Sequence, residues 1–176
     1  LLQHTAEIKV SVLLKLIQGY KNNYFESGEI PDLSNPFHKN IWNTFLCFLD
    51  HQLFYPFHLN LHTDNRGSFA ETAKLKSGGQ ISFSTTAPGL TRGNHFHTRK
   101  SERFAVIKGQ AKIEIRRIGT DLKHSFLLNG DRPSFVDMPI WFTHNVTNIG
   151  DDDLYTIFWI NEEYDPSDPD TYFEEV

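Results

Sequence analysis

Residues 89–102 read GLTRGNHFHTRKSE. The two histidines, His95 and His97, are two positions apart, and on a β-strand such side chains project to the same side. Glu102 can reach the same point from the next bend or strand, and His144 is a fourth candidate from a later cluster. Three imidazoles and one carboxylate form a mixed nitrogen and oxygen ligand set, which suits a divalent transition metal.

The chain after Pro56 has the pattern of a β-protein. Short alternating or β-branched runs are separated by Gly, Asn and Asp turn residues, and 14% of all residues are aromatic, which favours strands. Many short strands at regular spacing predict a sandwich or a barrel. The expected strands lie near 57–62, 68–75, 80–86, 103–108, 111–118, 123–128, 134–137, 143–148 and 154–161.

The N-terminal part has helical periodicity instead. Apolar spacing predicts a helix over about 6–20 with Thr5 as its N-cap, and a second helix that begins with Asn35 as N-cap and Pro36 in the first turn. Residues 24–36 between them are a plausible hinge. The apolar faces need a partner, which is left open between the other helix, the β-rich region and a further domain.

Composition and charge exclude several classes of protein. The net charge is −5 over 176 residues, and no Lys or Arg follows Arg132, so the acidic C-terminal stretch repels nucleic acid and anionic membranes. We expect these acids to be solvated. No apolar run approaches the roughly 20 residues that span a bilayer. The single cysteine, Cys47, excludes an internal disulfide and fits a reducing, cytoplasmic location; its apolar neighbours predict a buried thiol.

Two clusters of residues resemble the motifs of a known family, the cupins. The first motif of the cupins, G-x5-H-x-H-x4-E-x6-G, is matched at each fixed position by Gly89, His95, His97, Glu102 and Gly109. Of the second cupin motif, Pro139, His144 and Asn148 are present, while Trp141 replaces a glycine. The resemblance implies a mainly β fold, a cupin jelly-roll β-barrel, preceded by a two-helix N-terminal segment.

Two longer stretches resemble particular families within the cupins. The run DNRGSFAE at 64–71 is similar to the D-x-R-G-x-F-x-E stretch of the cupin-fold deoxythymidine-diphosphate-sugar 3,5-epimerases. Residues 62–159 resemble the C-terminal cupin of the bifunctional capsular polysaccharide synthesis enzymes of the CapF family. Residues 1–52 resemble the end of the short-chain reductase domain that precedes that cupin, which implies a helical remnant at 1–52 and a cupin domain at 53–176.

The resemblance to that family implies an activity. Its cupin is a metal-containing epimerase that inverts C3 of a UDP-2-acetamido-2,6-dideoxy-4-ketohexose, on the way to N-acetyl-L-fucosamine for capsule. It also implies zinc as the metal and a homodimer. NADPH serves only the reductase domain, whose G-x2-G-x2-G and Y-x3-K signatures are missing here.

Roles for individual residues follow from the same resemblance and from residue chemistry. The metal ligands would be His95, His97, Glu102 and His144. Arg66 would hold the diphosphate, since a guanidinium suits phosphate, with Arg92 in the loop before the metal strand and Trp141 at the pocket mouth as further substrate contacts. Glu71, Lys100 and Tyr155 are the candidates for proton transfer, and the sequence does not choose between them.

The sequence is compatible with three functions. A metal with four protein ligands can be closed and structural, or it can expand to take a substrate oxygen. The chain is therefore expected to be a C3-epimerase or, alternatively, a non-catalytic metal-stabilised cupin that binds ligand or dimerises the reductase. The ligand set would also permit an Fe(II) dioxygenase, against which the Arg66 region argues.

Overall fold

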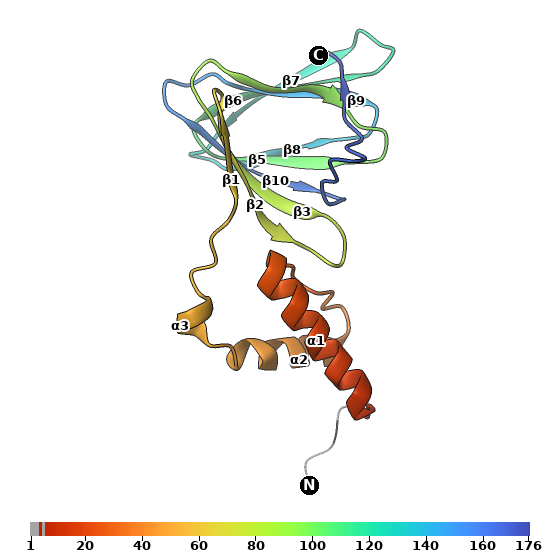
Figure 1. Ribbon diagram of the computed structural model, residues 1–176. Helices are drawn as coiled ribbons and strands as arrows, with labels where there is room; N and C mark the ends of the chain where they lie inside the picture. The colour runs from red at the N-terminus through yellow and green to blue at the C-terminus, as the bar shows by residue number, and fades with distance from the viewer. Residues whose placement is uncertain (1–3, 5) are drawn as a thin grey trace. The chain divides into compact units, whose positions relative to one another are not determined.

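The computed structural model describes residue 4 and residues 6–176, which form two compact units (Figure 1). The helical unit comprises Leu1–His58, as far as described, with Ala73–Gly78, and the β unit comprises Leu59–Thr72 with Gly79–Val176. Among the described residues, no helix combines the length and apolar character needed to cross a bilayer. The origin of residues 1–52 in an upstream domain remains a prediction.

The helical unit contains α1 (Val10–Ser27), α2 (Pro36–Cys47) and the single turn α3 (His51–Phe54). The first helix starts later and ends later than predicted, and Thr5 lies outside the described residues. Gly28 ends α1 because it adopts a left-handed φ of 68°, and its N–H bonds the carbonyl of Tyr24.

The start of α2 confirms its prediction. Asn35 is the N-cap, its side chain accepts hydrogen bonds from the backbone N–H groups of Phe37 and His38, and Pro36 occupies the first helical position. The second helix ends at Cys47, with Phe48 as its C-cap.

The two long helices bury an aromatic cluster. Tyr20 and Trp42 are both nearly inaccessible and pack edge to face at 5.2 Å between ring centroids. Cys47 is exposed, which contradicts the predicted buried thiol. Because successive helix residues turn by 100°, Cys47 lies about 140° around α2 from Trp42 and faces away from the cluster. Phe48 and Leu53 are also exposed.

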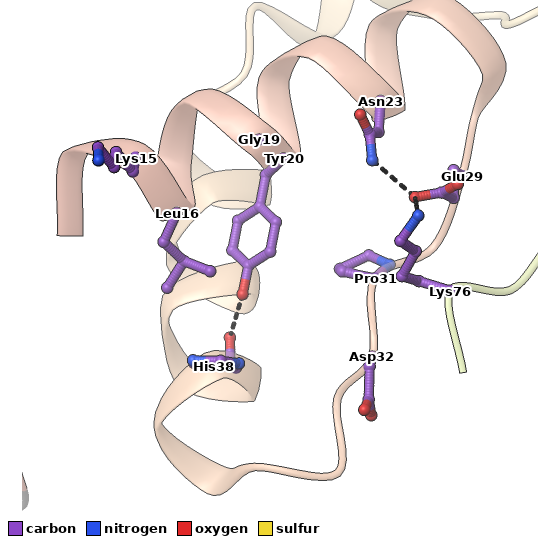
Figure 2. A pocket seen from close by; sticks show the side chains of 10 residues that line it. All are labelled: Lys15, Leu16, Gly19, Tyr20, Asn23, Glu29, Pro31, Asp32, His38 and Lys76. Carbon is purple, nitrogen blue, oxygen red and sulfur yellow. Dashed lines mark hydrogen bonds and ion pairs between the residues drawn. The ribbon is translucent and has the colours of Figure 1, made fainter. Parts of the chain in front are cut away.

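A pocket of about 290 Å³ lies within the helical unit (Figure 2). On one side the Tyr20 hydroxyl donates to the carbonyl of His38, and on the other Glu29 accepts from Asn23 and lies 3.9 Å from the Lys76 ammonium. Its lining contains none of the residues that the sequence predicts for the functional site.

The β unit consists of two antiparallel sheets, drawn as two layers in Figure 1. The six-stranded sheet has the order β1-β2-β3-β10-β5-β8, and the five-stranded sheet has the order β11-β4-β9-β6-β7. The strands are β1 (Leu61–Asp64), β2 (Gly67–Lys74), β3 (Gln80–Thr86), β4 (Thr91–Phe96), β5 (Glu102–Lys108), β6 (Gln110–Arg117), β7 (Lys123–Asn129), β8 (Ser134–Met138), β9 (Phe142–Asn148), β10 (Leu154–Ile160) and β11 (Tyr172–Phe173).

The mainly β class and most of the strand positions are confirmed. The first predicted strand is wrong in position, because only its last two residues, Leu61 and His62, are paired. Arg92 lies inside β4 rather than in a loop before it, and β11 had no counterpart in the prediction. With only two residues, β11 is too short to show the alternating pattern of a strand, which needs several repeats to be detected.

The apolar core fills one side of the space between the sheets. Val106, Ile113 and Leu154 are fully buried within it. The inner face of β3 is polar instead: Gln80, Ser82 and Ser84 are almost inaccessible. The barrel interior is therefore divided into an apolar part and a polar part, and the polar part is where chemistry can take place.

Candidate metal centre

The four predicted ligands lie on three strands or directly after one of them, and they are close together. His95 lies near the end of β4, His97 follows that strand, Glu102 opens β5, and His144 lies on β9. His95 and His144 are direct partners across the β4–β9 pair, with ring centroids 4.7 Å apart. One ligand atom from each of the four residues lies within 4.8 Å of the others. The antiparallel pairing thus brings together residues about 50 positions apart in sequence.

The ligand atoms are buried and point at a common centre. His97, Glu102 and His144 are 4%, 7% and 2% exposed. Glu102 Oε2 lies 2.9 Å from His144 Nε2 and 3.5 Å from His97 Nε2, yet these three atoms have no aligned hydrogen bond within the described residues. A divalent metal about 2.0–2.2 Å from each nitrogen and oxygen would separate tetrahedral ligands by roughly 3.3 Å. The spacing and the missing hydrogen bonds both fit such an ion.

The protonation states also favour metal binding. Burial raises the pKa of Glu102, but the adjacent His144 and His97 outweigh it and hold the pKa of this carboxyl well below its usual range. Burial, reinforced by His144, lowers the pKa of His95 to about 4. The Glu102 carboxylate and the neutral His95 imidazole are the forms that bind metal, and both prevail at neutral pH. Burial lowers the pKa of His97, but the Glu102 carboxylate and the Asp170 backbone outweigh it and raise that pKa, so a metal must displace a proton more readily bound there.

Local backbone geometry aims His95 inward. Gly93 has a φ of 100° and Asn94 a φ of 58°, and the β4–β9 register shifts between Gly93 and His95. A side chain at Gly93 would lie 2.6 Å from the carbonyl oxygen of His144, so glycine permits this close approach. Asn94 turns outward, where its side-chain oxygen accepts from Asn145.

Trp141 adopts the left-handed backbone conformation expected of the glycine that it replaces in the second cupin motif. Its φ is 62°, and its N–H bonds the carbonyl of His97. Left-handed backbone costs a non-glycine residue about 1–2 kcal/mol, so surrounding contacts hold it. The ring is half exposed and stacks on Phe96, which points to the opposite side of β4 from His95. The role of Trp141 in substrate binding stays a prediction that this placement does not favour.

Asn148, the last fixed residue of the second motif, is structural. Its fully buried amide donates to the carbonyls of Thr86 and Asp152, and its oxygen accepts from the N–H of Gly150. It therefore ties the end of β9 to β3 and to the following turn.

The two predicted cationic contacts lie together. Arg66 donates to the Asp64 carboxylate from its backbone N–H and its guanidinium, and the Arg92 guanidinium lies 3.6 Å from the same carboxylate. These contacts, chiefly from Arg66, lower the pKa of Asp64 to about 2. Arg92 also donates to the carbonyl of Thr85. Two cations thus share one anion, which leaves a net positive charge.

The three candidates for proton transfer lie in different environments. Lys100 is 1% exposed, and its ammonium donates to the carbonyl of Pro169 at 2.9 Å. Tyr155 packs on Phe83, and it alternates along β10 with the inward-facing Thr156, so its ring lies on the outer face of the sheet. The role of Tyr155 stays a prediction that this placement does not favour.

Glu71 differs from the other two because it shares the inner sheet face with Glu102. Gln80, Ile160 and Glu102 are in register across β3, β10 and β5, and the Gln80 amide donates to Glu71 at 3.4 Å. Residues in register on neighbouring strands have the same orientation. Glu71 therefore faces the polar part of the interior.

Sequence reasoning missed the C-terminal segment, whose acids were expected to be solvated. Asp170 is only 3% exposed and lies against the ligand-bearing turn, and Asp168 and Glu162 both pair with Arg99. The expectation is wrong for Asp170, whose carboxylate has specific donors that are distant in sequence, whereas the Asp168 side chain is 66% exposed and stays solvated. A dispersed acidic stretch carries no periodic signal that would have revealed those contacts.

Comparisons with known proteins place the chain among polysaccharide-synthesis proteins. Residues 62–172 match the family model described as the polysaccharide biosynthesis C-terminal domain. A curated relative, UDP-2-acetamido-2,6-beta-L-arabino-hexul-4-ose reductase of Pseudomonas aeruginosa, is 40% identical over 132 residues, which are 75% of this chain and 35% of that protein. The spore coat polysaccharide biosynthesis protein SpsL of Bacillus subtilis is 26% identical over 119 residues, 62% of this chain and 79% of that protein.

A solved structure shows a similarity to the same group of proteins. The capsular polysaccharide assembling protein CapF from Staphylococcus aureus superposes with a TM-score of 0.84 and 38% identity, over 93% of this chain and 44% of that chain. This chain thus spans about a third of the P. aeruginosa reductase and less than half of that CapF chain. The similarity covers both the helical segment and the cupin barrel.

Proposed function

Because the chain belongs to the polysaccharide biosynthesis C-terminal domain family, we propose that it is a metal-containing cupin epimerase. It would invert C3 of a UDP-2-acetamido-2,6-dideoxy-4-ketohexose during synthesis of the capsule precursor N-acetyl-L-fucosamine. The observation that carries the proposal is the buried convergence of His95, His97, Glu102 and His144. The name of the P. aeruginosa relative, which specifies a UDP-linked 4-ketohexose, supports this class of substrate.

Inversion next to a ketone needs a stabilised enolate and two proton transfers. A divalent cation held by the four ligands would polarise the C4 carbonyl as a Lewis acid. Glu71 is the best placed of the three candidates to remove the C3 proton, since it shares the inner sheet face with Glu102. Three strand spacings of about 4.8 Å separate the two backbones by roughly 14 Å, and both carboxylates reach inward from there, leaving room for a sugar ring.

The diphosphate would bind at Arg66 and Arg92. Arg92 and His95 lie opposite Val146 and His144, which are two residues and therefore roughly 7 Å apart along β9. This separation suits a nucleotide sugar whose diphosphate contacts the arginines and whose hexose reaches the metal ligands. Asp64 pre-orients both guanidiniums, because each contacts its carboxylate.

The proposal also includes the identity of the metal and the assembly. Zinc suits the three histidines and one carboxylate. A homodimer is supported by an apolar outer face on the six-stranded sheet, where Ile107, Phe135, Ile157 and Trp159 are exposed by 38–53%. Residues 1–52 would be the end of a reductase domain, and NADPH would serve that domain alone. A cytoplasmic location fits these activated-sugar reactions.

One observation favours a second function. All four positions around the common centre come from protein side chains, as in closed structural zinc sites. The alternative is therefore a non-catalytic cupin whose metal stabilises the barrel, and which binds ligand or dimerises the reductase.

Solvent exchange distinguishes the two functions. We expect metal-loaded protein, incubated in D2O with the UDP-linked 4-ketohexose, to incorporate deuterium at C3, because a removed C3 proton is replaced from solvent. Mass spectrometry and NMR measure the label, and chelator-treated protein is the control. A folded, metal-loaded protein that leaves C3 unlabelled would establish the non-catalytic alternative.

Replacing Arg66 with alanine is expected to lower kcat/KM for this exchange about 10–100-fold, mainly through KM. A hydrogen bond to a charged group contributes about 1.5–3 kcal/mol, and each 1.4 kcal/mol is tenfold. Arg103→Ala is the matched control, because Arg103 is an exposed arginine that pairs with Asp137 on the outer sheet face. Equal KM values for both variants would remove Arg66 from the substrate site.

A further inference from the structure

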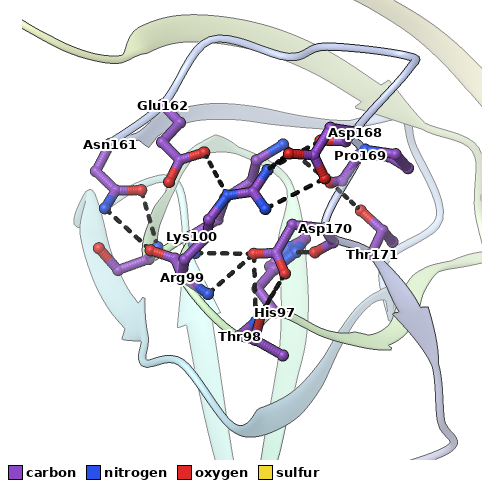
Figure 3. Close-up of polar contacts among 11 residues, drawn as sticks. His97, Thr98, Arg99, Lys100, Asn161, Glu162, Asp168, Pro169, Asp170 and Thr171 are labelled. Atoms are coloured by element: carbon purple, nitrogen blue, oxygen red, sulfur yellow. Dashed lines mark hydrogen bonds and ion pairs between the residues drawn. The ribbon is translucent and has the colours of Figure 1, made fainter.

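Asp170 is a buried acid that no motif predicts. Its carboxylate accepts hydrogen bonds from the backbone N–H groups of Thr98, Arg99 and Lys100 and from the Thr98 hydroxyl (Figure 3). These donors are three consecutive residues that directly follow the ligand His97. The carboxylate therefore fixes the turn between β4 and β5, and with it the separation between His97 and Glu102.

The backbone of Asp170 holds the ligand itself. Its carbonyl oxygen lies 2.5 Å from Nδ1 of His97. Since a carbonyl only accepts, Nδ1 carries the proton, and Nε2 is left with its lone pair towards Glu102, 3.5 Å away. Such a contact on the far nitrogen of a ligating imidazole sets its tautomer and its ring orientation.

The segment around Asp170 is anchored on both sides. The Lys100 ammonium donates to the carbonyl of the preceding Pro169, and the following β11 pairs with β4, so that Phe173 lies opposite His95. Beyond β11, the Thr143 hydroxyl donates to the carbonyl of Glu174. The C-terminal segment thus contacts the strands that carry His95 and His144, as well as the turn after His97.

The backbone at Asp170 is strained. Its φ is 45°, in the left-handed region that side chains other than glycine, asparagine and aspartate rarely adopt. Non-glycine residues persist in such conformations where surrounding contacts determine them fully, and these sites cluster at functional positions. The carboxylate contacts supply that constraint here.

We propose that Asp170 is a positioning residue of the metal centre, which orients His97 through its carbonyl and sets the His97–Glu102 turn through its carboxylate. This inference rests on the proposed metal site, but it does not depend on the reaction performed there. The acidic C-terminal segment thereby joins the sheet that carries His95 and His144, where β11 pairs with β4 at the edge.

The test is metal affinity in the Asp170→Asn variant. Asparagine has nearly the same shape and tolerates a left-handed φ, but its NH2 group would face backbone N–H donors in place of a carboxylate oxygen. We expect about 10–100-fold weaker Co2+ and Zn2+ binding in competition with a chromophoric chelator, the loss typical of outer-shell changes. The visible spectrum of bound Co2+ should also change, because the His97 ring is reoriented.

Asp168→Asn is the matched control. Asp168 lies in the same segment and pairs with Arg99 at the surface, so both affinity and spectrum should match the wild type. If Asp170→Asn lowers only the unfolding temperature of the metal-free protein, with affinity and Co2+ spectrum unchanged, Asp170 is merely structural and the proposal is wrong.

A second variant covers the case in which Asp170→Asn does not fold. Thr98→Val removes only the hydroxyl donor to the carboxylate, and a few-fold weaker affinity is expected in the same direction. An unchanged affinity would overturn the proposal. Because metal binding is measured directly, weaker binding without any C3 exchange in the wild type would uphold this inference and reject the epimerase.

Discussion

Glu102→Gln is expected to weaken metal binding by more than about 100-fold and to abolish C3 deuterium exchange with it. The change keeps the shape of the side chain but removes the only anionic ligand among the four. Outer-shell changes already cost about 10–100-fold in affinity, so the loss of a direct ligand should exceed that range. Elemental analysis and chelator competition measure the first effect, and mass spectrometry measures the second.

Glu114→Gln is the matched control for this substitution. Glu114 is partly buried on the outer face of the five-stranded sheet, where it pairs with Lys112 and accepts from Ser125. Its replacement should leave metal content unchanged. If Glu102→Gln retained a full equivalent of metal at wild-type affinity, Glu102 would not be a ligand, and the centre would have to be built from histidines alone.

Gly93→Ala is expected to destabilise the β unit by about 2–5 kcal/mol and to reduce its metal content. The φ of 100° adds about 1–2 kcal/mol of backbone strain for a residue with a Cβ. That atom would also lie 2.6 Å from the His144 carbonyl oxygen and 2.8 Å from the Asn145 Cα, an overlap that costs about 1–3 kcal/mol. Relief requires β4 and β9 to separate, which moves His95 away from His144.

Gly89→Ala distinguishes the two causes of destabilisation, which are backbone strain and the close approach of an added Cβ to β9. Gly89 also has a left-handed φ, of 73°, but an added Cβ meets nothing within 4 Å. It should therefore lose only about 1–2 kcal/mol and keep its metal. Thermal unfolding and elemental analysis compare the two variants. Equal losses would show that backbone conformation, and not the approach of β4 to β9, is what Gly93 provides.

The ligand set was readable from spacing because strand geometry imposes it. His95 and His97 are separated by two positions, and Glu102 opens β5 only five positions after His97, so the short turn that joins the two sheets keeps them close. His144 was found through the second motif, although Trp141 interrupts it. The structure shows that the interruption is harmless, since Trp141 adopts the left-handed conformation itself.

The errors share one physical cause. Cys47 and the acids around Asp170 were judged from residue type and immediate neighbours, but burial depends on where a side chain lies in the folded chain. Cys47 is exposed because it lies on the far side of α2 from the aromatic cluster, and Asp170 is buried because the turn after His97 lies against it. The residue type and the immediate neighbours show neither fact.

The sequence by itself predicted the β-rich barrel, the N-terminal helices and the four candidate ligands through local periodicity and motif spacing, which are properties of consecutive residues. The two arginines came from a resemblance to a known family and from the chemistry of the guanidinium. Only the tertiary structure decided that Arg66 and Arg92 share Asp64, that Glu71 faces inward while Tyr155 faces outward, and that Asp170 holds His97. Those contacts join residues separated by as many as 73 positions, and they form only when the sheets pair.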